Sequence, residues 1–161
     1  MNKVYLSLCL SAVLMSASVR GSAAADYVSG AFEKSRAYST AVITKGGRVV
    51  WLAGEGGAKD DAGKDISDDF EAQVNLIFAH FQQTLGKLGG TNDDIVKMTV
   101  FIKDEKDGTP FVNMRKKFFP SGNYPASSLI TIKDLAQPGW KIEIEGFAVI
   151  GDECAPGSCV K

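Results

Sequence analysis

The chain has few of the residues that metal centres and nucleic-acid surfaces need. Among its 161 residues are one histidine and three cysteines, too few soft ligands for a zinc site. Its 18 basic and 19 acidic residues nearly cancel, with no basic stripe and no aromatic ladder for a nucleic acid. No internal repeat or low-complexity segment is present. We therefore expect one globular domain with no metal, no cofactor and no nucleic-acid partner.

The chain also lacks an apolar run long enough to span a membrane. Lys3 precedes an apolar stretch at residues 4–17, which is 14 residues long, whereas a spanning helix needs about 20. The small residues at 22–25 fit the small-x-small rule for signal peptidase. We interpret residues 1–25 as a cleavable signal peptide and expect a periplasmic or secreted protein with no membrane segment after cleavage. A membrane anchor or a buried helix is the alternative.

Export changes the interpretation of the cysteines in the C-terminal tail, residues 151–161. Cys154 and Cys159 flank Pro156 and Gly157, which form a tight loop that can bring the two sulfurs together. In an oxidising compartment a disulfide is favoured over two free thiols. We expect a Cys154–Cys159 disulfide that staples the tail and has no catalytic role.

Hydrophobic patterning predicts an α/β domain over residues 26–150. Short strands at 42–43 and 49–52 flank a Gly46-Gly47 turn. A long helix follows a cap at Ser67 and ends at Gly89-Gly90. Its apolar residues fall on one arc and predict a core face, as follows: Phe70, Val74, Ile77, Phe78, Phe81, Leu85 and Leu88.

The second half of the domain alternates between strands and one shorter helix. Residues 95–103 alternate, with Val96, Met98, Val100 and Ile102 on one face, and predict a strand parallel to an earlier one. A helix is expected at 110–119, and strands at 127–133 and 141–150. The predicted order is ββαβαββ, a mixed sheet with two helices on one face.

One face of this sheet has no predicted cover. The residues expected to point away from the helices are Phe101, Leu129, Thr131, Phe147 and Val149, most of them apolar. A monomer rarely leaves such a face in water, so we expect oligomerisation through it. Cover by loops or by the tail is the alternative.

Four segments together resemble the RidA family, the reactive-intermediate (enamine/imine) deaminases. The segments are 35–42 (SRAYSTAV), 94–104 (DIVKMTVFIKD), 111–128 (with FVN, FF and YPASS) and 135–149 (ending IEIEGFAV). The resemblance covers about residues 38–150, in order. It implies a chorismate-mutase-like fold, a homotrimer with sheets packed at its centre, and three small-molecule clefts between subunits.

The sequence departs from the family pattern at three places. The family's P-A-R-[ST] segment, whose arginine pairs with a substrate carboxylate, has Ser127 at the arginine position. A hydroxyl cannot replace the bidentate, charge-assisted grip of a guanidinium. The family's T-S-G-Q turn corresponds here to Leu52 followed by Ala53, Gly54 and Glu55, and His80 stands where the family helix usually has asparagine.

The resemblance also assigns roles to residues that match the pattern. Glu145 corresponds to the glutamate thought to position the attacking water, a task that a carboxylate near an iminium can perform. Tyr38 is placed at the cleft rim, although a packed aromatic is the usual role for such a residue. Asn113 is a weak candidate for ligand contact, because it can equally tie neighbouring backbone. Glu143 and His80 are expected at the surface, His80 as a solvated or interface histidine.

The substitutions predict an altered ligand preference. If Glu55 and Glu145 approach the cleft and no arginine answers them, the cleft becomes negative and rejects carboxylates. Arg36 or Arg115 reaching into the cleft would restore the positive charge. The function expected is imine or enamine hydrolysis with altered substrate preference. The alternatives are a non-catalytic small-molecule binder or scavenger, and a protein-interaction module.

Overall fold

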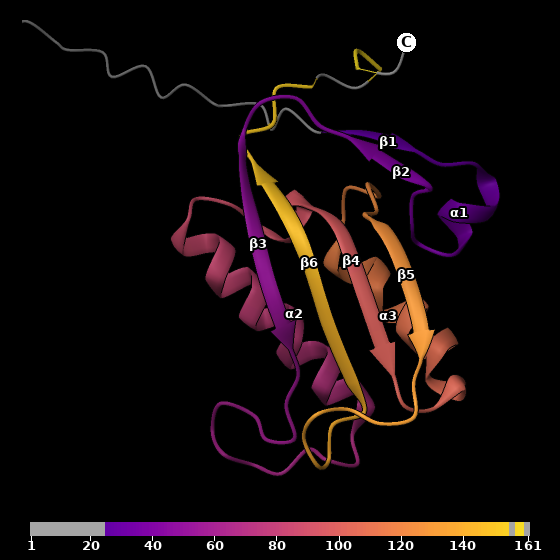
Figure 1. Ribbon diagram of the computed structural model, residues 1–161, viewed down its shortest axis with the longest axis vertical. Coiled ribbons are helices and arrows are strands. Elements are labelled where there is room, and N and C mark those ends of the chain that lie inside the picture. The colour runs from indigo at the N-terminus through magenta and orange to yellow at the C-terminus, as the bar shows by residue number, and fades with distance from the viewer. Residues whose placement is uncertain (1–24, 155–156, 160–161) are drawn as a thin grey trace, which may run out of the picture.

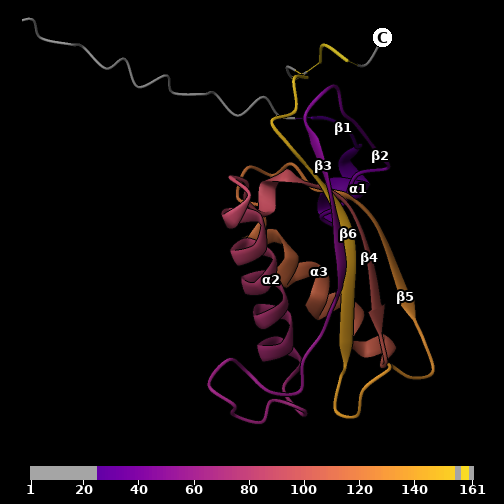
Figure 2. The ribbon, with the colours of Figure 1, turned by 60° about the vertical axis from the view of Figure 1, so that its left-hand side comes forward.

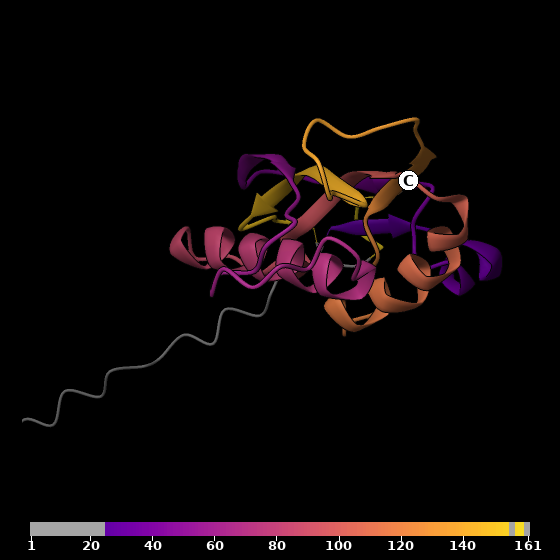
Figure 3. The same ribbon diagram turned by 90° about the horizontal axis from the view of Figure 1, so that it is seen from below.

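The computed structural model describes residues 25–154 and 157–159, so the interpretation of residues 1–25 as a signal peptide lies almost wholly outside it. The elements, in chain order, are β1 (Asp26–Val28), α1 (Ala31–Ser35), β2 (Ala41–Ile43), β3 (Arg48–Glu55), α2 (Phe70–Lys87), η1 (Asn92–Asp94), β4 (Ile95–Ile102), η2 (Glu105–Asp107), α3 (Gly108–Phe118), β5 (Ala126–Thr131) and β6 (Ile142–Ile150). Figure 1 shows this arrangement. Helices α2 and α3 cover the same face of the main sheet, as Figure 2 and Figure 3 show.

The main sheet is mixed, which confirms the predicted fold class. Its four strands have the order β3-β6-β4-β5. Strand β6 pairs antiparallel with both β3 and β4, and β4 pairs parallel with β5. Strands β3 and β4 therefore run in the same direction, as predicted, but the last strand of the chain lies between them. Of the described helices, none is both long and apolar enough to cross a membrane.

A small second sheet, formed by β1 and β2, was not predicted. The expectation that residues 42–43 and 49–52 pair across the Gly46-Gly47 turn is wrong, because β2 pairs with β1 and β3 pairs with β6. The turn itself is present, with φ of 67° and 73° at the two glycines. A Cβ on Gly47 would lie 2.8 Å from a methyl of Val149, so the turn packs on β6 and directs β3 into the main sheet.

Helix α2 supplies more residues to the core than any other element, on the face that its periodicity predicted. Six of the seven residues of the expected arc are buried, whereas Leu88, the helix C-cap, is 39% exposed. The predicted cap at Ser67 is wrong by two residues, because the Asp69 side chain accepts a hydrogen bond from the amide of Ala72. The helix ends as expected, with Gly89 at a φ of 84°.

The alternation of β4 is confirmed at Met98, Val100 and Ile102, which are buried under the helices. Val96 does not follow it, because an irregularity between Ile95 and Lys97 shifts the register and places Ile95 in the core. The parallel partners of the buried β4 residues on β5 are Ser127, Leu129 and Thr131. These three residues therefore face the helices, which corrects the prediction that Leu129 and Thr131 point away.

The opposite face of the sheet, here called the outer face, carries exposed apolar side chains. The large ones are Val49, Trp51, Ile130 and Phe147. Trp51 is 75% exposed and meets Phe147 edge-on, with ring centroids 4.6 Å apart. Phe101 shares this face, as predicted, whereas Val149 is buried beneath the Gly46-Gly47 turn.

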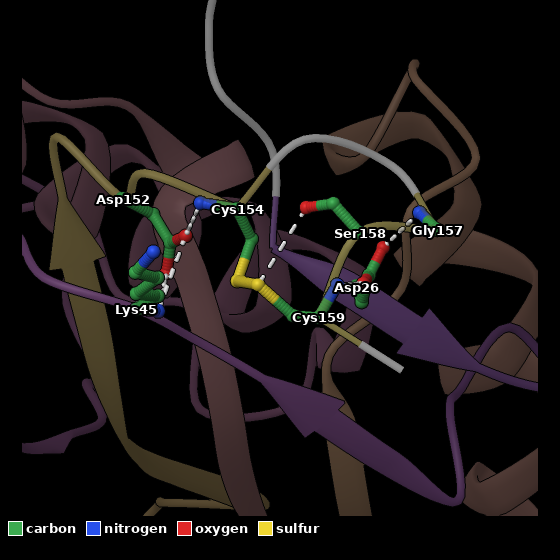
Figure 4. Close-up of a disulfide and its surroundings, with 7 residues drawn as sticks. All are labelled: Asp26, Lys45, Asp152, Cys154, Gly157, Ser158 and Cys159. Atoms are coloured by element: carbon green, nitrogen blue, oxygen red, sulfur yellow. Dashed lines mark hydrogen bonds between the residues drawn. A yellow bond between two sulfur atoms is a disulfide. The ribbon is translucent and has the colours of Figure 1, made fainter. Parts of the chain in front are cut away.

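The C-terminal tail is tied to the N-terminal strand. The predicted disulfide between Cys154 and Cys159 is present (Figure 4). The Asp26 carboxylate, at the start of β1, accepts hydrogen bonds from the amides of Gly157 and Cys159. Asp152 accepts from the Cys154 amide at 2.7 Å and more weakly from the Lys45 amide. The disulfide loop therefore holds the first residue of β1. Through Asp152, the residues next to the loop also hold the turn that precedes β3.

Candidate functional site

A cavity of about 250 Å³ lies between α3, the start of β5 and the turn after α1. Its lining residues are Arg36, Tyr38, Val112, Arg115, Ser127 and Leu129. In Figure 1 these elements meet at the β5 edge of the sheet. Of the sequence-predicted site residues, the structure brings Tyr38 and Ser127 together here.

Arg115 is the central residue of this cavity. It follows Phe111 by four positions on α3, and its guanidinium lies over the Phe111 ring, 5.2 Å from the centroid. Nη1 donates a hydrogen bond to Ser127 Oγ at 2.6 Å, and Nη2 donates to the Arg36 carbonyl at 2.7 Å. The residue is only 3% exposed. Nη1 also contacts Met98 Sδ on β4 at 4.0 Å. These contacts with separate segments of the chain fix the guanidinium in one orientation.

Among the residues that the structure describes, this buried cation has no anionic partner. Within residues 25–154 and 157–159, no acidic side chain lies at ion-pair distance from Arg115. Its Nε is buried without a hydrogen-bond partner. Burial, and then the nearby charge of Arg36, lowers the pKa of Arg115 to about 10, so it stays protonated at neutral pH. A buried, unpaired charge is costly, and an anion bound in the cavity would offset that cost.

The wall opposite α3 is held by an unusual backbone conformation. Ala37 is fully buried with a φ of 54°, a left-handed conformation that side chains rarely adopt. It turns the chain between α1 and β2 and leaves the Arg36 carbonyl directed at Arg115. Ser39 then anchors the segment to the start of β5, since its amide donates to the Pro125 carbonyl and its hydroxyl to the Tyr124 carbonyl. Strained backbone of this kind clusters at binding sites.

Of the two arrangements that the sequence left open, the cavity has the one with an arginine in it. Position 127 is serine, but Arg115 brings a guanidinium to the same place from a neighbouring helix. Ser127 acts as the acceptor that positions it. The sequence had left Arg36 and Arg115 open as possible replacements, and both line the cavity. The choice could not be made from sequence, because it depends on how α3 is rotated against β5.

The other predicted site residues lie elsewhere in this single chain. Glu145 is exposed on the outer face of β6, opposite Thr99, whereas Ser127 faces the helices. Residues 53–55 belong to β3, at the far edge of the sheet from β5. Asn113 is exposed on α3 and does not line the cavity. Within the single chain, Glu145 therefore does not line the cavity that holds Arg115.

Glu145 has a cation for a neighbour on the outer face. Lys97 Nζ donates to Ser128 Oγ at 3.1 Å and to the Met98 carbonyl at 3.0 Å. Partial burial lowers the pKa of Lys97, and the charge of Glu145 opposes that shift. The charge of Glu145 thus favours the protonated form of Lys97, although the two are not among the ion pairs of the described residues.

Glu55 and His80 belong to a separate cluster. His80 Nδ1 lies 3.3 Å from Glu55 Oε2, and Nε2 lies 2.9 Å from Asp61 Oδ1. The hydrogen bond to Asp61 and, after it, that to Glu55 raise the pKa of His80 against an opposing effect of burial. His80 thus joins α2 to the end of β3 and to the following loop, and Glu55 is not directed at the Arg115 cavity. The sequence had suggested a solvated or interface histidine. In the structure His80 contacts two carboxylates of its own chain.

Glu143 has a packing role that its sequence context did not predict. It is half-buried, and its carboxylate lies against Gly54, where an added Cβ would overlap it. The absence of a Cβ at Gly54 leaves room for this carboxylate, and a larger residue there would displace the flexible end of the Glu143 side chain.

Comparisons with known proteins agree with the fold and the sequence pattern. The family model described as Endoribonuclease L-PSP matches residues 28–150. The RutC family protein YjgH of Escherichia coli is 29% identical over 72% of this chain and 85% of its own length. A Dermatophagoides farinae protein named 2-iminobutanoate/2-iminopropanoate deaminase is 26% identical over 70% of this chain and 85% of its own. The crystal structure of YyfB, a Rid-family protein of Yersinia pestis, superposes with a TM-score of 0.65 at 25% identity, covering 72% of this chain and 89% of that one.

Proposed function

Since the chain belongs to the RidA family, whose model carries the description Endoribonuclease L-PSP, we propose that its cavity binds a small carboxylate-bearing molecule through Arg115. One observation carries the proposal: the guanidinium is buried, oriented by two hydrogen bonds and has no counterion within the described chain. A carboxylate pairs bidentately with such a group. The carboxylate of the ligand would then be the counterion of the Arg115 guanidinium.

The reaction proposed is hydrolysis of an imine to a carbonyl compound and ammonia. In balanced form, R₂C=NH and H₂O give R₂C=O and NH₃. Water adds to the imine carbon, a proton moves to nitrogen, and the C–N bond of the resulting carbinolamine breaks. Arg115 would hold the carboxylate and so fix the imine carbon in place. The name of the Dermatophagoides farinae relative supports this reaction class for a related chain.

Glu145 is proposed as the group that handles the water proton. A carboxylate can accept a proton from the attacking water and return it to the departing nitrogen. Glu145 lies on the other face of the sheet from Ser127, so this role needs a second copy of the chain to bring the two together.

Assembly of three copies through the outer face is the arrangement we propose. What supports it is the exposed apolar surface, since Trp51 and Val49 are 75% and 57% exposed. Monomers rarely leave so large a patch in water. The role proposed for Glu145 requires that this assembly bring it to the β5 edge of a neighbouring copy. We propose that the assembled protein acts after export, which the disulfide supports.

A binder or scavenger without catalysis is the second candidate. It is favoured by one observation, that Glu145 and the cavity lie on opposite faces within one chain. A protein-interaction role would use the outer face instead. Binding and turnover therefore have to be measured separately.

The experiment follows 2-iminopropanoate, generated in situ, with the wild type, Arg115→Met and Glu145→Gln, alongside calorimetric binding of 2-oxobutanoate. Enzymatic function predicts acceleration in the wild type, loss of binding and rate in Arg115→Met, and loss of rate with binding retained in Glu145→Gln. Binding without acceleration would establish the scavenger instead. Wild type that binds no small carboxylate would refute the proposal.

A further inference from the structure

We infer that the cavity selects an acid with two carboxylates, the first held by Arg115 and the second by Arg36. This inference rests on the proposed function and concerns the same cavity. It goes further because it assigns a specificity role to a residue that matches no ligand-binding position of the family pattern. The juxtaposition that carries it is two arginines that line one small cavity, close enough for the charge of Arg36 to act on Arg115.

The first step is the balance of charge. Arg36 and Arg115 both line the cavity, and none of the six lining residues is acidic. The side chain of Arg36 makes no ion pair with any residue in the described ranges. The two charges interact, since Arg36 contributes to the lowered pKa of Arg115. Two neighbouring cations repel each other, and a ligand with one negative charge neutralises only one of them.

The second step is the difference in how the two arginines are held. Arg115 is buried and donates to Ser127 and to the Arg36 carbonyl, so its position is fixed. The Arg36 backbone is fixed by the same contact, whereas its side chain is half-buried and has no hydrogen bond of its own among the described residues. Arg36 can therefore adjust to the far end of a ligand that Arg115 has already oriented.

The size of the cavity limits the length of the ligand. A volume of about 250 Å³ lies below the range of about 300–1,000 Å³ that is usual for drug-sized ligands, so the cavity suits a smaller molecule. The walls between the two arginines include Val112, Leu129 and Tyr38, which suit a short carbon chain rather than a sugar or a base. A dicarboxylic 2-oxo or 2-imino acid of about four or five carbons fits both the charge and the volume.

The test compares two acids of equal chain length, 2-oxoglutarate and 2-oxopentanoate, by titration calorimetry with the disulfide intact. We expect the diacid to bind wild type about tenfold more tightly, which is the difference that one added charge-assisted contact supplies. Arg36→Gln should reduce this preference to within about twofold, mainly by weakening the diacid. Raising the salt concentration should narrow the wild-type preference, because Arg36 is partly in solvent.

The matched control is Lys34→Gln. Lys34 lies on α1, two residues from Arg36, is exposed and does not line the cavity, so its removal changes net charge alone. Lys34→Gln should keep the wild-type preference. If it abolishes the preference as Arg36→Gln does, the effect is one of overall charge and the inference is overturned. Arg36→Lys keeps the charge without the planar fork and should retain part of the preference.

The outcomes separate the inference from the proposed function. Equal affinities for both acids in wild type overturn the inference and leave the proposed carboxylate site standing. Failure of both acids to bind refutes the proposed function itself. Inorganic phosphate serves as a further probe, because it carries its charges on one centre. If phosphate binds tightly while the diacid is not preferred, the claim that Arg36 binds a second carboxylate is refuted.

Discussion

Arg115 on α3 and Ser127 on β5 form a hydrogen bond of 2.6 Å that joins the helix layer to the edge strand of the sheet. The sequence resemblance places Ser127 at the position of the family's arginine. We propose that Arg115 supplies the positive charge there from the adjacent helix. A site of this kind would be missed if each motif position were compared alone.

Replacing Arg115 should separate binding from stability. Arg115→Met removes a buried charge that has no ion-pair partner among the described residues, and with it two hydrogen bonds. The relieved desolvation cost and the lost bonds oppose each other, so stability should change by less than about 2 kcal/mol. Binding of a small carboxylate should fall by about two orders of magnitude or more, because a charge-assisted pair is lost. Urea unfolding and calorimetry on the same samples measure the two effects. A variant that loses stability and binding together would indicate a purely structural arginine.

Removing the Ser127 hydroxyl should disturb the cavity without removing its charge. Ser127→Ala leaves Arg115 Nη1 without that acceptor, and an unsatisfied buried donor costs about 1–3 kcal/mol. Ser128→Ala is the neighbouring control, since Ser128 is exposed and accepts from Lys97 on the outer face. Chemical denaturation should show a larger loss for Ser127→Ala. Equal losses would mean that the hydroxyl does not position the arginine.

Gln73 should prove to be the most sensitive polar residue of the core. It is fully buried, and its amide donates to the Ile66 and Gly139 carbonyls while accepting from the Lys141 amide. Gln73→Leu leaves these backbone groups unpaired and should cost about 3 kcal/mol or more. Gln73→Glu keeps an acceptor but loses the donors, so it should not restore stability. Thermal unfolding of both variants beside the wild type tests this, and a loss below about 1 kcal/mol in Gln73→Leu would contradict it.

His80 should make stability depend on pH in one direction. Its pKa is raised in the folded protein, by the Asp61 hydrogen bond first, above the ordinary value of 6.5. The stabilisation is therefore complete below the unfolded pKa and is lost as the pH rises through the folded pKa. Because Asp61 is exposed, we expect less than about 1 kcal/mol. The difference in melting temperature between wild type and His80→Gln should shrink from about pH 5.5 to pH 8.5; a difference that grows would have the wrong sign.

Removing the disulfide should loosen the N-terminal strand as well as the tail. For a loop this short, the entropy of the unfolded chain accounts for about 2 kcal/mol. The Cys154→Ser, Cys159→Ser double variant should also expose β1 amides to hydrogen exchange, because Asp26 accepts from Gly157 and Cys159 within the loop. Exchange at Tyr27 and Val28 gives the local readout. Unchanged exchange there would show that Asp26 holds the loop without help from the disulfide.

Several features follow from local sequence. The arc of α2 and the alternation of β4 were predicted because burial on one face imposes a period of 3.6 or 2 on the residues themselves. The disulfide also followed, from two cysteines around a tight turn. Local signals failed at β1 and β2, which have three residues each and show no period. They failed too at the Gly46-Gly47 turn, which has hairpin chemistry but does not join paired strands.

The sequence by itself determined which family the chain resembles, which residues fill the core, and that position 127 carries no charge. Only the tertiary structure decided that the charge is present nevertheless. Arg115, Ser127 and Arg36 come from three elements whose contact depends on the rotation of α3, the register of β5 against β4 and the left-handed turn at Ala37. None of these is a property of a single segment, because each is set by how separate segments pack against one another.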